Sequence, residues 1–176
     1  GSEESAGPNA PNDSGVRVRV FLKQDGRSWE NAIRAGFQPE SFGALGPALS
    51  SDPDPSPAMI GLLIPDLEIG RFYQQYLASV PRAISIAIAH GFAVYSQALA
   101  PKNPQHTPLL LAPKAIGQKL REAFVQARPA PHSLVAAASG SSEIYEALGA
   151  ALGFSPKRLV RCSFETETIG DLISEQ

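Results

Sequence analysis

Three histidines and one cysteine are the side chains of this 176-residue chain that most often act as nucleophiles, bases or metal ligands. His90, His106 and His132 are far apart, and none has the HExxH spacing of a zinc-binding helix. The sequence contains neither a GxSxG nucleophile turn nor a GxxxxGKS/T phosphate loop. Cys162 stands alone, so it forms neither an intramolecular disulfide nor a cysteine-based zinc site. These observations argue against a hydrolase, a P-loop enzyme and a cysteine-based zinc site.

Charged residues near both ends of the chain are better candidates for a site. Glu165 and Glu167 lie two residues apart in an alternating segment, which predicts that both carboxylates occupy one face of a strand. Lys23 and Arg27 follow the first predicted strand, with Asp25 between them. On the residues alone, the acids are also consistent with the solvated face of an amphipathic strand. The bases are also consistent with solvated residues after an edge strand.

Composition and charge narrow the possible partners. Lys plus Arg number 15 and Asp plus Glu number 17, so the chain lacks the basic excess that a nucleic-acid-binding domain carries. The longest apolar run, residues 83–94, is shorter than the roughly 20 residues of a membrane-spanning helix. Residues 1–15 contain no large apolar side chain and are predicted to be disordered. We expect one domain over residues 16–176, as a monomer, with no nucleic-acid partner and no membrane span.

Hydrophobic spacing predicts the elements that position these residues. Residues 16–22 alternate as a strand, and a turn at Asp25 and Gly26 leads into a helix that begins at Ser28 and ends at Gly36. Prolines and serines predict a loop over residues 39–58. The further predictions are a helix from residue 66 or 68 to 77, helix again over 84–92, a short buried element at 109–111, a helix over 115–125, a strand over 133–138, a helix over 141–152 and a strand over 159–168.

The histidines take their predicted environments from these elements. His90 would lie on the apolar helix, where a hydrogen-bonded core position is the usual role. His106 and His132 lie beside prolines in predicted loops and are expected at the surface.

The stretch from residue 22 to 39 resembles the opening of mono-ADP-ribosyltransferase toxins of the pertussis and cholera kind. Lys23 stands where that family has the arginine that grips the phosphates of the dinucleotide, and lysine lacks the planar two-point fork. The positions that match the family pattern are Asp25, Arg27, Glu30, Gly36, Phe37 and Pro39.

Two further parts of the chain are similar to that family. Residues 133–164 look like its second strand, helix and strand, although alanines at 136–138 replace the Ser-Thr-Ser of the nicotinamide pocket. The resemblance implies that Ala137 and Ser139 line the cofactor pocket. It also implies that Glu167 stabilises the charge developing at the nicotinamide ribose while Glu165 activates the acceptor.

The resemblance implies an α+β fold with an ADP-ribosyltransferase-like split β-sheet core and flanking helices. NAD would be the cofactor, without a metal, and a host protein or peptide the partner. The Ala, Pro and Gly usage is similar to that of type III effectors of plant pathogens such as the Xanthomonas outer proteins, secreted by the bacterium into the host cytoplasm. Two alternatives are a catalytically inactive binding module that does not bind NAD and an unrelated α+β interaction module.

Overall fold

The structure is a computed structural model that describes residues 17–54, 58–115, 117–126, 128–138 and 143–174. Residues 1–15 and Ser139 therefore lie outside the described residues. In chain order the elements are β1 (Phe21–Leu22), α2 (Arg27–Arg34), β2 (Glu40–Ser41), η1 (Phe42–Ala44), α3 (Leu45–Ser51), β3 (Ala58–Leu62), α4 (Asp66–Tyr76), β4 (Ile84–Ile88), α5 (Phe92–Tyr95), β5 (His106–Pro113), α6 (Gly117–Val125), β6 (Ser133–Ala137), α7 (Glu143–Ala151), η2 (Pro156–Arg158), β7 (Leu159–Arg161) and α8 (Phe164–Ser174).

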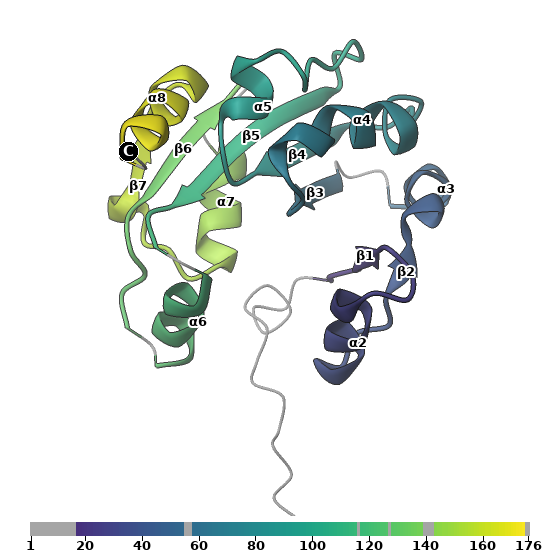
Figure 1. The fold of residues 1–176 in the computed structure, drawn as a ribbon, viewed down its shortest axis with the longest axis horizontal. Coiled ribbons are helices and arrows are strands. Elements are labelled where there is room, and N and C mark those ends of the chain that lie inside the picture. The colour runs from purple at the N-terminus through teal and green to yellow at the C-terminus, as the bar shows by residue number, and fades with distance from the viewer. Residues whose placement is uncertain (1–16, 55–57, 116, 127, 139–142, 175–176) are drawn as a thin grey trace, which may run out of the picture.

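A five-stranded sheet of order β3-β4-β5-β6-β7 forms the centre of the molecule (Figure 1). β3, β4 and β5 are parallel neighbours, β6 runs antiparallel to β5, and β7 is parallel to β6. Every residue of β4 is buried, as expected for a parallel strand covered on both faces. The short helices and loops between the parallel strands provide the crossovers that parallel pairing requires.

The two faces of this sheet carry separate apolar clusters. The larger cluster contains alternate residues of β4, such as Ile84, Ile86 and Ile88, together with side chains of α4 and α5. The smaller cluster contains Leu111 and Val135 from the other face, packed against α7. The sheet is therefore a middle layer between helices, in an α/β arrangement.

A second, two-stranded parallel sheet pairs β1 with β2, and Figure 1 places it with α2 on the β3 side of the larger sheet. Phe21 of β1 and Phe42 of η1 pack against the larger apolar cluster. The Phe42 ring meets the Phe72 ring of α4 edge-on, with 5.0 Å between centroids. These contacts hold the small sheet beside the large one.

The expected α+β split-sheet fold is wrong, because several segments form other elements. Residues 84–88 form a strand, since their isoleucines alternate with a period of two. The predicted loop over 39–58 contains a strand and two helices, and the predicted strand over 159–168 ends after three residues and is followed by α8. His106 is buried at the start of β5, although it was expected at the surface. No helix in the described part of the chain has the length and apolarity that crossing a membrane would need.

Candidate functional site

Two polar side chains follow neighbouring parallel strands. His90 comes two residues after the end of β4, and Lys114 follows the last residue of β5 directly. Because β4 and β5 are parallel, their carboxyl ends meet at the same edge of the sheet. This edge is where open α/β sheets bind their ligands.

The helix α8 brings two carboxylates to the same edge. Ser163 caps this helix: its hydroxyl accepts the Thr166 backbone N–H at 2.9 Å and satisfies one free donor of the first turn. Glu167 and Asp171 are four residues apart and therefore share one helix face. α8 packs against α5, the helix that follows His90, and this contact directs the acidic face toward the strand ends.

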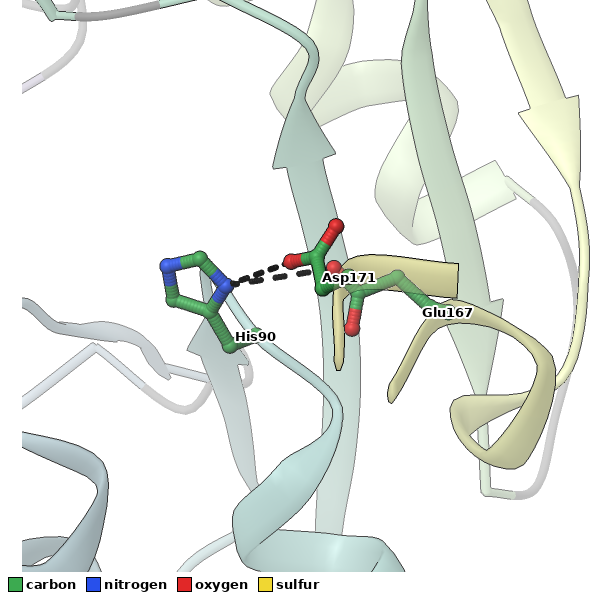
Figure 2. Close-up of side chains that lie close together, drawn as sticks. All are labelled: His90, Glu167 and Asp171. Atoms are coloured by element: carbon green, nitrogen blue, oxygen red, sulfur yellow. Dashed lines mark hydrogen bonds and ion pairs between the residues drawn. The ribbon is translucent and has the colours of Figure 1, made fainter. Parts of the chain in front are cut away.

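The four side chains form one hydrogen-bonded cluster, which we call the acidic cluster: His90, Lys114, Glu167 and Asp171. The Lys114 Nζ donates to Asp171 Oδ1 at 2.6 Å and to Glu167 Oε1 at 3.2 Å. His90 Nδ1 lies 3.0 Å from Asp171 Oδ2 and 3.9 Å from Glu167 Oε1. Figure 2 shows the imidazole pointing toward the two carboxylates that α8 supplies.

Glu167 is the buried member of the acidic cluster, with a fully inaccessible side chain. Its Oε2 accepts the Gly91 backbone N–H at 2.6 Å, a charge-assisted bond that offsets part of the cost of burial. A Cβ at Gly91 would lie 2.5 Å from the Phe164 carbonyl oxygen and 2.8 Å from Thr168 Oγ1. The close approach that makes this bond therefore requires glycine.

Burial and neighbouring charge act on the pKa values of the cluster in opposite directions. Burial raises the pKa of Glu167, although the bonds from Gly91 and Lys114 lower it in part. Burial alone would also raise the pKa of Asp171, but the hydrogen bonds from Lys114 and His90 outweigh it and the pKa is lowered. The pKa of Lys114 is raised, since its bonds to both carboxylates outweigh the effect of burial.

The donor set of the acidic cluster fits a divalent cation. One ligand atom each from His90, Glu167 and Asp171 lie within 4.8 Å of one another. Carboxylate oxygens are the ligands that hard cations such as Mg²⁺ prefer. The two carboxylates of the acidic cluster carry two negative charges, and the Lys114 ammonium carries one positive charge. When His90 is neutral the cluster therefore has a net negative charge, which favours cation binding.

The structure separates the residues selected from sequence. Glu167 belongs to the acidic cluster, whereas Glu165 is exposed on the first turn of α8. The expectation that both acids share a strand face is wrong, because the segment is helical. Ala137 is half-buried at the end of β6, which runs antiparallel to β5, and it pairs with Leu109 rather than with the Lys114 end.

The predicted phosphate-binding residues lie on the turn between β1 and α2. Lys23, Asp25 and Arg27 are all exposed there. Asp25 has φ of 58°, in the left-handed region that aspartate tolerates in turns.

Sequence reasoning missed three members of the acidic cluster: His90, Lys114 and Asp171. A helix beginning after Ser163 would have revealed Asp171, because it follows Glu167 by one helical turn. Reading residues 84–88 as a strand would have placed His90 at a strand end, instead of the predicted core position on a helix. His90 is in fact exposed, with 55% of its side-chain surface accessible.

Comparison with known proteins gives the family. A profile of the family "Acetohydroxy acid isomeroreductase, NADPH-binding domain" matches residues 1–156. The chain belongs to this family. A ketol-acid reductoisomerase (NADP(+)) of Pyrobaculum aerophilum is 33% identical over 170 residues, covering 93% of this chain and 48% of the relative. The chain thus spans about half the length of this curated relative.

Solved structures agree with the acetohydroxy acid isomeroreductase family. An NADH-preferring ketol-acid reductoisomerase from an uncultured archean superposes with a TM-score of 0.79 and 25% identity, over 95% of this chain and 50% of that chain. A putative oxidoreductase from Jannaschia sp. CCS1 superposes with a TM-score of 0.66 and 18% identity, over 97% of this chain and 65% of that chain, and supports the fold alone.

Family membership overturns the resemblance to ADP-ribosyltransferases. The short motif at residues 22–39 occurs here in an NADPH-binding domain with a largely parallel sheet, so its match was a coincidence of turn and helix spacing. The expectations of a secreted effector, a virulence role, a host-protein partner and a host-cell location depended on that resemblance and are wrong. The expected nicotinamide cofactor agrees with the family, whose domain is NADPH-binding.

Proposed function

We propose that this chain forms the nicotinamide-binding and cation-binding part of an oxidoreductase of the ketol-acid reductoisomerase type, acting on a small acetohydroxy acid. The acidic cluster at the carboxyl edge of β4 and β5 is the observation that carries this proposal. Supporting it, the family's domain binds NADPH, and a relative that aligns with nearly all of this chain is an NADP(+) enzyme.

The turn after β1 is the proposed site for the 2′-phosphate of NADPH. In dinucleotide-binding sheets a polar side chain bonds the adenosine ribose, and a basic side chain nearby accommodates the 2′-phosphate of NADP. Lys23 and Arg27 are exposed on this turn and supply two positive charges against the single negative charge of Asp25. Sequence reasoning had assigned these residues to a dinucleotide phosphate, and the proposal keeps that chemistry in a different fold.

In the acidic cluster, the proposed cation ligands are the carboxylates of Glu167 and Asp171. A divalent cation bound there would polarise a substrate oxygen as a Lewis acid. Lys114 Nζ donates a hydrogen bond to Asp171, and His90 Nδ1 forms a second hydrogen bond with it. Together these two bonds fix the orientation of the Asp171 carboxylate. Glu165, exposed on the same helix, has no part in this proposal.

Fluorescence titration with NADPH and NADH tests the cofactor assignment. We expect NADPH to bind more tightly, and replacement of both Lys23 and Arg27 by Ala to remove about a tenfold preference, equivalent to about 1.4 kcal/mol. Lys102→Ala is the matched control, since Lys102 is exposed before the amino end of β5, at the opposite sheet edge. Equal affinity for both cofactors in the unmodified chain would contradict the assignment.

Manganese binding tests the cation site. Electron paramagnetic resonance of Mn²⁺ should show binding that weakens at least about tenfold in Asp171→Asn, because one of two anionic ligands is lost. Glu165→Gln removes the same charge from the same helix at an exposed position and should bind Mn²⁺ as the unmodified chain does. Equal loss in both variants would show that general charge, and not the cluster, attracts the ion.

A further inference from the structure

All four carboxylate oxygens of the acidic cluster have hydrogen-bond partners within the protein. Glu167 Oε2 accepts the Gly91 backbone N–H, and Asp171 Oδ2 lies 3.0 Å from His90 Nδ1. The other two oxygens, Glu167 Oε1 and Asp171 Oδ1, share the ammonium of Lys114 at 3.2 and 2.6 Å. A divalent cation that binds both carboxylates therefore competes with partners that the protein itself supplies.

These partners differ in how readily they can leave. The Gly91 N–H belongs to a buried stretch of backbone, packed closely against α8. Movement of His90 would release an oxygen of Asp171 alone. Lys114 carries its ammonium on a flexible four-carbon side chain, 38% of which is exposed. Its departure would release one oxygen on each carboxylate at the same time.

The Lys114 ammonium lies where a cation shared by the two carboxylates would bind. Glu167 and Asp171 lie on adjacent turns of α8, and Figure 2 shows their carboxylates beside one another. Nζ contacts the one oxygen of each that neither the backbone nor the imidazole holds. A divalent ion on these same oxygens would be within contact distance of the ammonium, and the two positive charges would repel each other.

We infer that Lys114 is the internal counter-ion of the cation site, and that its ammonium and a divalent cation exchange places between Glu167 and Asp171. The ammonium holds the two carboxylates together, and it turns toward solvent when the cation binds. The exchange weakens cation binding, because each cation must displace a tethered positive charge. This inference rests on the proposed cation site.

Manganese titrations followed by electron paramagnetic resonance test the exchange at low ionic strength and one neutral pH. Lys114→Met should bind Mn²⁺ at least about tenfold more tightly than the unmodified chain, because no ammonium competes. Lys114→Arg retains the charge and should bind within about threefold of the unmodified chain. Unchanged or weaker binding by Lys114→Met would overturn the inference and leave the cation site standing. No binding by any of these chains would overturn both.

Lys119→Met is the matched control for general charge. Lys119 is exposed on α6 and pairs with Glu122 at 3.0 Å, outside the acidic cluster. Its loss removes the same charge and should leave the Mn²⁺ affinity within about twofold, because solvent and salt screen an exposed charge. An equal gain in Lys119→Met and Lys114→Met would show that net charge sets the affinity, and would overturn the inference.

Nuclear magnetic resonance of the lysine ammonium groups follows the exchange in the unmodified chain. The signal that disappears in Lys114→Arg belongs to Lys114. We expect Mg²⁺ to shift and weaken this signal, because the ammonium loses its bonds to the carboxylates, and to leave the Lys119 signal unchanged. A Lys114 signal that persists unchanged at saturating Mg²⁺ would show that both cations bind together, and would overturn the inference. This measurement decides the question if Lys114→Met does not fold.

Urea unfolding gives a readout of the same exchange through stability. In a chelating buffer, Lys114→Met should unfold at a lower urea concentration than the unmodified chain, because two neighbouring carboxylates lose their shared partner. Saturating Mg²⁺ should remove most of this difference, since the cation takes the place of the ammonium and stabilises the folded state that binds it. A difference that Mg²⁺ leaves unchanged would contradict the exchange.

Discussion

A buried carboxylate beside a half-exposed one gives the acidic cluster its chemical asymmetry. Glu167 is inaccessible and Asp171 retains 27% of its side-chain exposure, so their pKa values move in opposite directions. Burial raises the pKa of Glu167, whereas the hydrogen bonds from Lys114 and His90 lower the pKa of Asp171. None of this was predictable from sequence spacing, because Lys114 and Asp171 are 57 residues apart and meet only through the fold.

Asp171→Asn should lower stability in a pH-dependent way. A lowered folded-state pKa means that the ionised Asp171 stabilises the fold above its unfolded pKa, about 3.9, and that this stabilisation is lost as pH falls through the folded pKa. We expect a loss of about 1 kcal/mol at neutral pH, given the partial exposure of the pair. Urea unfolding at pH 7 and near pH 3 measures this. An equal loss at both pH values would contradict the electrostatic explanation, and Glu165→Gln should cost little at either.

The buried pair Tyr73 and His106 supports the core at the amino end of β5. The Tyr73 hydroxyl lies 2.9 Å from His106 Nδ1, and both side chains are nearly inaccessible. Tyr73→Phe should cost roughly 1–3 kcal/mol, because an imidazole nitrogen is left buried without its partner. Chemical denaturation of this variant measures the loss. A cost within about 0.5 kcal/mol would show that the nitrogen finds another partner.

At the scale of elements, local signals explain which predictions succeeded. The helices α4, α6 and α7 and the strand β6 are confirmed, because their apolar spacing and flanking turn residues agree on one structure. The sequence of α8 resembles a strand because Phe164, Glu165 and Thr166 continue the alternation of β7, although Ser163 caps a helix. The sequence of β4 is compatible with both strand and helix because its isoleucines recur at two-residue and four-residue intervals.

Packing of α8 on the loop after β4 gives a prediction with a matched control. Gly91→Ala places a Cβ against the Phe164 backbone and should cost roughly 1–3 kcal/mol, because the helix must move and the bond to Glu167 is weakened. Gly170→Ala, on α8 itself, meets nothing within 4 Å and should be neutral or stabilising by up to about 1 kcal/mol. Equal effects of the two substitutions in urea unfolding would contradict the close packing.

At the scale of the molecule, the two sheets differ in how they are held. The larger sheet has a continuous ladder through five strands and an apolar cluster on each face. The smaller sheet has two short strands, and Trp29 and Phe37, which flank the helix between them, are only half-buried. The parallel sheet could have been predicted from buried strand segments, but no local sequence signal shows that β1 and β2 pair apart from the larger sheet.

Hydrogen exchange should therefore show two levels of amide protection, one in the larger sheet and one in the smaller sheet. Amides of β4 and β5 should exchange only through global unfolding, since their ladders are buried on both faces. Amides paired between β1 and β2 should exchange faster by at least about tenfold, through local opening that leaves the larger sheet intact. Native-state exchange at increasing urea concentrations measures both levels. A single common opening energy for β1 and β4 would show that the apolar contacts of Phe21 and Phe42 already couple the two sheets fully.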